Sequence, residues 1–224
     1  MREPRAAFRL AGLFLFAAVR LAQSAANLPL LVSDDFETGT AARWTPCDPA
    51  RWRVAEGEGN RFYELTAPGE AGKVRAPTSW SVLSTAGLSS FALTGRVKCY
   101  TDPANNKRDM CIVFGFQDPT HFYYVHFSAS SDNVHNVIAL VNGADRVKIN
   151  LEPEGKSVFR LTDKAWHAFK VVREPDGRIA AYIDDMTVPV LTAKDVTLPP
   201  GRVGVGSFDD TGAFDDIVLR GRTP

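Results

Sequence analysis

Tyr124 and His126 could exchange protons, and they lie two residues apart in the apolar run Phe122–Ser128. If this run is a strand, both side chains project from the same face. Tyrosine and histidine can serve as acid and base when a proton beside a carboxylate is removed and a leaving oxygen is protonated. Polar partners that could bind a substrate come from neighbouring segments: Gln117, His135, Asn136, Arg146 and Lys148. The set predicts a polysaccharide lyase, a sugar-binding face without turnover, or ordinary half-buried strand residues.

Other chemistries have little support in the sequence. His121, His126 and His135 form no His-x-His pair, and no Cys-x-x-Cys motif is present, so a transition-metal site is not predicted. A Gly-x-Ser-x-Gly elbow is also missing. The Gly-x-Gly at residues 204–206 opens no helical pattern, so we expect no nucleotide and no organic cofactor.

The elements that would position these groups are short strands. Apolar residues alternate at period two, and Gly, Pro, Asn or Asp interrupts them every eight to twelve residues, which is typical of an all-β sandwich or barrel. The expected strands are Leu31–Phe36, Trp52–Ala55, Arg61–Thr66, Trp80–Ser84, Ser89–Tyr100, Asp109–Gln117, Phe122–Ser128, Val134–Val141, Arg146–Leu151, Ala165–Glu174, Arg178–Asp184, Thr187–Leu191, Arg202–Phe208 and Phe214–Arg220.

The segment 109–128 predicts a hairpin closed by Asp118–His121. In this register the inner face pairs Phe116 with Tyr123, Phe114 with Val125, and Ile112 with Phe127. The other face carries Cys111, Gly115, Gln117, Tyr124 and His126, and a glycine opposite a tyrosine predicts a shallow open groove there.

Two segments near the start and the end of the expected domain have similar acidic sequences. The acidic segment Ser33–Gly39 resembles the acidic loop that joins the last two expected strands. We therefore expect the first and last strands to be neighbours, with carboxylates concentrated where they meet.

Residues 1–26 predict a secretory signal peptide. Three arginines precede the uncharged run Leu10–Val19, and small residues follow it. The run is too short to span a bilayer, and we expect no membrane span after cleavage. Removing these residues takes away four arginines and one glutamate, which leaves 22 basic and 25 acidic side chains and a net charge of −3. Residues 27–224 are thus predicted to be one secreted domain without the basic tract that nucleic acid requires.

Three cysteines remain in this exported segment: Cys47, Cys99 and Cys111. Cys99 and Cys111 flank one loop and are the expected pair if a disulfide forms. The alternative is that all three are buried, reduced side chains.

Three segments carry a family likeness. Cys111–Pro119 with Phe122–Phe127, Trp166–Val171 with Ile179–Asp184, and Gly204–Phe208 with Phe214–Ile217 resemble units of concanavalin A-like and laminin-G-like jelly rolls. The resemblance implies a two-sheet antiparallel jelly-roll sandwich over nearly all of residues 30–221. It also implies a superfamily of lectins, carbohydrate-binding modules, glycoside hydrolases, lyases and adhesion domains, so the fold does not name the function.

Motifs of individual subfamilies match poorly. The Glu-x-Asp-x-x-Glu strand of laminarinase-like hydrolases is missing. Alginate-lyase-like members carry an Arg-x-Glu-Leu strand and a Gln-x-His strand. The Arg61–Leu65 segment is one residue longer than the first motif, and Gln117 and His126 do not match the second because they fall on separate strands.

The resemblance also implies a structural calcium ion between the first and last strands. The matching positions here are Asp35 or Glu37 near the first strand and Asp215 or Asp216 in the last strand. Carboxylates suit calcium, but Asp also favours solvated turns, which is the competing interpretation.

Aromatic side chains could supply sugar-stacking platforms: Trp44, Trp52, Tyr63, Trp80, Tyr100, Phe122 and Tyr124. We expect each tryptophan, Trp166 included, to belong to the core and Tyr100 to be the exposed ring. The leading prediction is a secreted domain that binds an oligo- or polysaccharide on the open face near Gln117, Tyr124, His126 and His135. The alternatives are a Tyr/His lyase and a protein-adhesion module.

Overall fold

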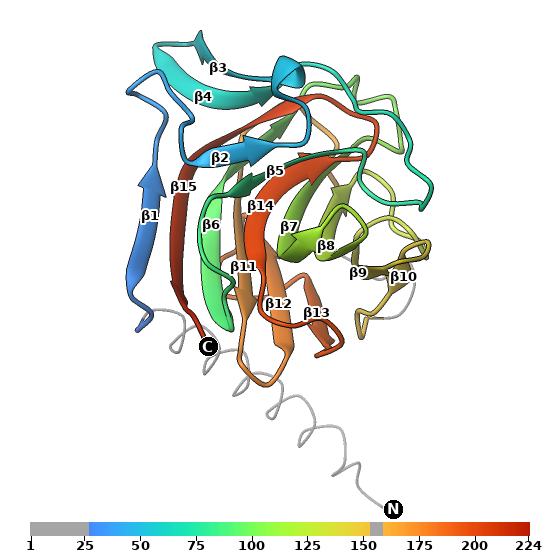
Figure 1. The fold of residues 1–224 in the computed structure, drawn as a ribbon. Helices are drawn as coiled ribbons and strands as arrows, with labels where there is room; N and C mark the ends of the chain where they lie inside the picture. The colour runs from blue at the N-terminus through green and yellow to red at the C-terminus, as the bar shows by residue number, and fades with distance from the viewer. Residues whose placement is uncertain (1–26, 153–158) are drawn as a thin grey trace, which may run out of the picture.

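The computed structural model describes residues 27–152 and 159–224, which form two antiparallel β-sheets packed face to face (Figure 1). The only helix in these ranges is one turn of 3-10 helix, Pro49–Arg51. The prediction of an all-β, two-sheet antiparallel jelly-roll sandwich is therefore confirmed.

Sheet A has the order β13-β12-β11-β6-β15-β4-β3, with β1 also paired to β15. Its strands are β1 (Leu30–Asp34), β3 (Trp52–Gly57), β4 (Asn60–Leu65), β6 (Ser90–Cys99), β11 (His167–Arg173), β12 (Arg178–Ile183), β13 (Leu191–Lys194) and β15 (Gly212–Arg222).

Sheet B has the order β10-β9-β8-β7-β14-β5-β2. Its strands are β2 (Trp44–Pro46), β5 (Ser79–Leu83), β7 (Asp109–Asp118), β8 (His121–Ser128), β9 (Val137–Asn142), β10 (Val147–Lys148) and β14 (Arg202–Ser207).

The first and last strands lie together, as predicted. β1 pairs antiparallel with β15, from Leu30 opposite Arg220 to Asp34 opposite Ile217. Figure 1 shows β1 along the outer side of β15, close to the C-terminus.

The core between the sheets consists of every second side chain of the strands. Its fully buried rings include Phe36, Phe91, Phe114, Tyr123, Phe127, Phe169 and Phe214. Burial of one such ring stabilises the fold by about 1.5–3 kcal/mol, so the period-two pattern determines which face of each strand turns inward.

The β7–β8 hairpin has a different register from the expected one. Phe114 lies opposite Tyr123 and Ile112 opposite Val125, a shift of two residues that leaves both pairs on the inner face. Phe116 is the exception, because a bulge at Gly115, with φ of +59°, reverses the alternation. The prediction that Phe116 faces the inner core is therefore wrong.

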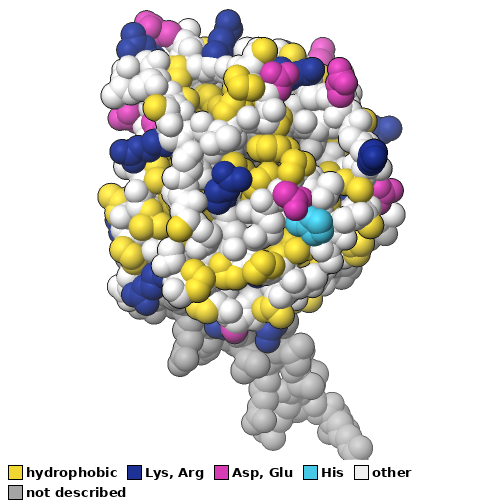
Figure 2. Space-filling model, viewed as in Figure 1, with side chains coloured by type: hydrophobic (Ala, Val, Ile, Leu, Met, Phe, Trp, Pro, Cys, Tyr) yellow, Lys and Arg dark blue, Asp and Glu magenta, His cyan; other side chains and the backbone are white. Residues whose placement is uncertain are grey.

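A second apolar layer covers the outer face of sheet B, where an open groove was expected. Strand residues such as Cys111, Val113, Phe122 and Tyr124 pack there in one cluster with Ala76 and Phe208 from connecting segments. Figure 2 shows this face, with apolar side chains across its middle and Lys or Arg side chains among them.

Three strand predictions need correction. The expected strand Thr187–Leu191 is mostly a turn, because Asp185 Oδ1 accepts hydrogen bonds from the backbone of Thr187 and Val188, and β13 begins only at Leu191. The expected strand Arg146–Leu151 shortens to β10, and β2 was not predicted.

The signal-peptide prediction concerns residues 1–26, which lie outside the described residues. Across 27–152 and 159–224, no helix has the length and apolar character to cross a membrane.

All three cysteines are free. Cys99 faces the core between the sheets, whereas Cys111 faces the outer layer of sheet B. The expected Cys99–Cys111 pair is therefore not formed, because the two thiols lie on different sides of sheet B.

Candidate functional site

The predicted acid–base pair on β8 is buried. Tyr124 is 0% exposed and His126 is 3% exposed. The predicted face is correct, since neither side chain enters the core between the sheets, but the prediction that this face is open is wrong. The Phe208 ring packs against both side chains, and sequence periodicity does not indicate how such a connecting segment folds back.

Three of the predicted site residues gather around one ring, that of Phe208, and a fourth lies beside His126. Its centroid lies 5.5 Å from the Tyr124 ring and 5.2 Å from the His126 ring. The Cζ atom of Arg146 lies 4.6 Å from the same centroid, and His135 lies 5.5 Å ring to ring from His126. Histidine, tyrosine and arginine therefore come together here, with Tyr124 and His126 buried and Arg146 half-buried.

The other three predicted ligand-binding residues lie elsewhere. Gln117 is exposed at the end of β7, where its amide donates to the carbonyls of Pro199 and Pro200. Asn136 is 3% exposed. Its side-chain amide accepts the backbone N–H of Ser128 and donates to the carbonyl of the same residue. Lys148 lies on the edge strand β10.

Burial also limits the chemistry of the covered group. It raises the pKa of the Tyr124 hydroxyl well above its usual value, and this hydroxyl has no hydrogen-bond partner. A neutral phenol with a raised pKa makes a poor base near neutral pH. His126 places Nε2 2.6 Å from Oδ2 of Asp109, while its Nδ1 has no partner.

Three of the four predicted calcium residues contact arginines: Glu37, Asp215 and Asp216. Oδ2 of Asp215 lies 2.7 Å from Nη2 of Arg96, and Oδ2 of Asp216 lies 2.6 Å from Nε of Arg96. Glu37 Oε1 accepts the backbone N–H of Arg61 at 2.8 Å. Asp35 Oδ1 accepts the backbone N–H of Glu37 at 3.2 Å.

This arrangement does not fit a calcium ion as it stands. The guanidinium already supplies the positive charge beside the Asp215–Asp216 pair. Among the described residues, the one group of three His, Cys, Asp or Glu side chains close enough to hold a metal lies elsewhere, in sheet B.

An open pocket lies on the outer face of sheet A, with a volume of about 300 Å³. Its walls come from the β3–β4 hairpin, from β6 and from the residue that precedes β11. Along these strands the pocket-lining side chains alternate with core side chains. Half-buried Phe62, for example, is followed by buried Tyr63. The lining residues are Gly57, Glu58, Asn60, Phe62, Arg96, Lys98, Tyr100 and Trp166.

Two of the pocket rings meet edge to face. Phe62 and Trp166 have ring centroids 5.7 Å apart at 68°. Arg96 and Lys98 place their cationic groups 5.2 and 5.9 Å from the Trp166 centroid. The ring is therefore fixed by contacts on two sides, and it is half-buried rather than part of the core as predicted.

Tyr100 is half-buried at the pocket wall. Burial and the nearby Glu64 carboxylate raise the pKa of its hydroxyl, so it stays a neutral hydrogen-bonding group across the physiological range. Glu64 is held by Arg53, at 2.6 Å. Tyr100 was expected to be the exposed ring, and it lines this pocket.

The roles of Phe62, Arg96, Lys98 and Trp166 were missed. The available signal was the alternation of polar or aromatic residues with core residues along Asn60–Leu65 and Ser90–Cys99. That pattern identifies the outward side chains, but it does not show that the β3–β4 hairpin and Trp166 enclose them.

No family model and no curated protein matches the chain. Solved structures do match at the level of fold. The carbohydrate-binding module CBM66 from Bacillus subtilis is 18% identical, with a TM-score of 0.55, and covers 80% of this chain and 95% of its own. Cellulose induced protein, Cip1, is 15% identical, with a TM-score of 0.56 and coverages of 84% and 96%.

Domain 4 of AbnA, a GH43 extracellular arabinanase from Geobacillus stearothermophilus solved in complex with arabinotriose, is also similar. It is 10% identical, has a TM-score of 0.53, and covers 87% of this chain and 93% of its own. At these identities the likeness establishes the fold of the chain.

Proposed function

We propose that this protein binds carbohydrate and that the site is the pocket on the outer face of sheet A. The observation that carries the proposal is a concave site where Phe62, Tyr100 and Trp166 stand beside polar groups. The C–H face of a sugar packs on an aromatic ring, while its hydroxyls need nearby donors and acceptors. Structures with this fold include domains whose names record carbohydrate binding or a bound oligosaccharide, which supports the same proposal.

The pocket divides these tasks between its walls. Trp166 and Phe62 offer ring faces and edges, while Asn60 and Glu58 offer an amide and a carboxylate. The charge of Arg96 is largely compensated by Asp215 and Asp216. Lys98 forms no ion pair with any described residue, so its ammonium is available to a ligand and favours a saccharide that carries a carboxylate.

Binding is tested on a panel of neutral and acidic oligosaccharides with two matched tryptophan variants. Trp166→Ala should weaken binding by about 10-fold or more, the effect of about 1.4 kcal/mol. Trp80→Ala is the control, because Trp80 is another half-buried tryptophan but packs on Phe116 over sheet B. Unchanged binding by Trp166→Ala, at an unchanged melting temperature, would contradict the proposed site. Loss of binding in Trp80→Ala alone would move it to sheet B.

A lyase activity of Tyr124 and His126 is the less favoured alternative, because both side chains are buried and a substrate would have to displace Phe208 to reach them. The check is absorbance from unsaturated sugar ends after incubation with acidic polysaccharides. Turnover that His126→Ala abolishes would reverse the order of the two functions.

We also propose that the protein is exported after removal of residues 1–26. The apolar run and the small residues after it support cleavage near 24–26. N-terminal sequencing of the exported protein tests this, and an intact Met1 in the exported chain would contradict it.

Calcium binding at Asp35, Glu37, Asp215 and Asp216 is an untested prediction from the sequence, and the Arg96 guanidinium between Asp215 and Asp216 argues against it. With Arg96 as counter-ion, calcium added back to chelator-treated protein should leave its melting temperature unchanged. A clear rise on adding calcium would show that an ion displaces the guanidinium.

A further inference from the structure

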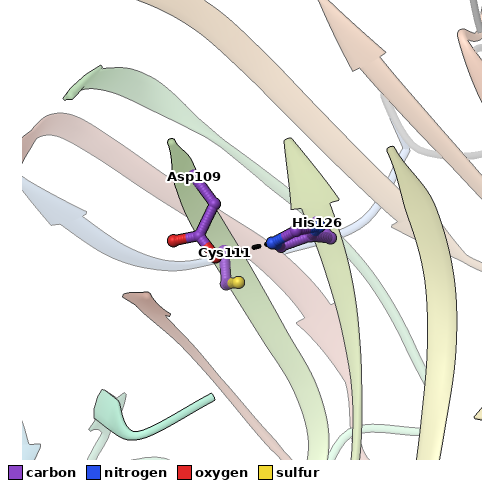
Figure 3. A group of neighbouring side chains, drawn as sticks. All are labelled: Asp109, Cys111 and His126. Atoms are coloured by element: carbon purple, nitrogen blue, oxygen red, sulfur yellow. Dashed lines mark hydrogen bonds and ion pairs between the residues drawn. The ribbon is translucent and has the colours of Figure 1, made fainter. Parts of the chain in front are cut away.

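Three side chains that commonly ligate metals converge on the outer face of sheet B. Asp109 and Cys111 lie two residues apart on β7, so they share a face, and His126 on β8 lies directly opposite Cys111. One carboxylate oxygen, the thiol sulfur and one imidazole nitrogen all lie within 4.8 Å of one another (Figure 3). The three residues are 2%, 0% and 3% exposed.

We propose that Asp109, Cys111 and His126 bind a zinc-class divalent transition-metal ion. Zinc accepts thiolate, imidazole and carboxylate ligands at about 2.0–2.3 Å in tetrahedral geometry. A hard ion such as calcium or magnesium would not select the sulfur. Three protein donors leave the fourth position to water or to a further ligand.

The distances need only a small adjustment. Tetrahedral ligands at such bond lengths stand about 3.4 Å from one another. Asp109 Oδ2 and His126 Nε2 are 2.6 Å apart, so they must separate by less than about 1 Å. The Cys111 sulfur lies within 4.8 Å of the carboxylate oxygen and the imidazole nitrogen, so it can move toward an ion that all three share.

The carboxylate is also oriented as a metal ligand would be. Its other oxygen, Oδ1, accepts the hydroxyl of Ser207 at 2.6 Å and the backbone N–H of Phe208 at 3.2 Å. These bonds fix the group and direct Oδ2 toward His126. Such outer hydrogen bonds typically hold the ligands of a metal site in place.

The charges of the three ligands suit a divalent ion. Metal uptake would displace the proton of the Cys111 thiol, and the thiolate plus the Asp109 carboxylate would then compensate the charge of the ion.

A purely structural interpretation also fits these positions: a buried Asp109–His126 hydrogen bond with Cys111 as a small apolar side chain. The two interpretations differ in one measurable property, which is a bond between sulfur and metal.

Cobalt(II) reports this bond directly. The protein is refolded with one equivalent of cobalt, because the site is covered, and the sulfur-to-cobalt charge-transfer band is recorded in the near ultraviolet. We expect the wild type to bind one cobalt ion and to show the band, and we expect added zinc to displace the cobalt and remove the band. Cys111→Ser should bind zinc more than about 100-fold more weakly than the wild type. Cys47→Ser and Cys99→Ser are the matched controls and should keep both the band and the affinity.

Circular dichroism and melting establish that each variant folds, and Cys111→Ala provides a second substitution if the serine variant does not. The proposal is overturned if the folded wild type takes up no stoichiometric metal. It is also overturned if bound cobalt shows no thiolate band, or if the band survives in a folded Cys111 variant. Glycan binding at sheet A is measured separately, so its failure is distinguishable from failure of the metal site.

Discussion

Arg96 Nη2 lies 2.7 Å from Oδ2 of Asp215, a carboxylate with no exposed surface on the last strand of sheet A. Asn60 donates to the same oxygen at 2.7 Å. The contact connects β6, β15 and the β3–β4 hairpin at the base of the aromatic pocket. The acidic pair that the sequence places near the chain ends is thus organised around a guanidinium.

Replacing this arginine should cost stability. Arg96→Met leaves the buried carboxylate of Asp215 with fewer partners, and we expect a loss of about 1–2 kcal/mol, discounted because the arginine is partly exposed. Lys98→Met is the matched control: it lies two residues along the same strand and face, and it should change stability by less than about 0.5 kcal/mol. Chemical denaturation of both variants gives the comparison, and equal effects would contradict the role of Arg96.

The same variant has a predicted pH dependence. Burial raises the pKa of Asp215, and Asn60, the Asp216 backbone N–H and the charge of Arg96 oppose this rise. A carboxyl whose folded-state pKa is raised favours the folded state below its unfolded pKa of about 3.9, and that contribution is lost as pH rises through the folded value. Without Arg96 the rise is larger. The stability deficit of Arg96→Met should therefore be greater at pH 7 than at pH 4, and a deficit that grows on acidification would contradict this.

The fold was predictable because burial imposes period two on every strand, so the inward side chains of β7 and β8 were identified although their pairing was shifted by two residues. The site was less predictable. Whether the outer face of His126 is open depends on Phe208, which comes from the connection that follows β14. The pocket likewise depends on Trp166 reaching Phe62 across more than one hundred residues of chain. The alternation of residues within one strand predicts neither the cover over His126 nor the contact between Trp166 and Phe62.

Gly115 explains why Phe116 faces the outer layer of sheet B and not the core. Its φ of +59° is costly for other residues, and an added Cβ would lie 2.8 Å from Cδ2 of Tyr123. Gly115→Ala should destabilise the protein by about 2–3 kcal/mol, since backbone strain and a clash add. Gly59→Ala shares the positive φ, +75°, but meets nothing within 4 Å, so about 1 kcal/mol is expected. Similar melting temperatures for the two variants would argue against the clash.

The thiols should react in two classes. Cys47 is half-buried, whereas burial raises the pKa of both Cys99 and Cys111. Because the thiolate is the nucleophile, iodoacetamide should label only Cys47 in the native protein at pH 8 and all three cysteines in guanidinium chloride without reductant. Peptide mapping by mass spectrometry distinguishes the sites. Failure of Cys99 and Cys111 to react after unfolding would indicate a disulfide between them.

Tyr123 on β8 connects sheet B to the loop that follows β13, the edge strand of sheet A. Its buried hydroxyl donates to Oδ1 of Asp195 at 2.6 Å and accepts the backbone N–H of Leu198 at 2.9 Å. Tyr123→Phe leaves that N–H and carboxylate without this partner, which should cost about 1–3 kcal/mol. Tyr182→Phe is the control, because the Tyr182 ring is equally buried but its hydroxyl has no partner. Its removal should be neutral or slightly stabilising. Denaturant midpoints measure both, and a larger loss for Tyr182→Phe would show that the hydroxyl contacts are not the source of the stability.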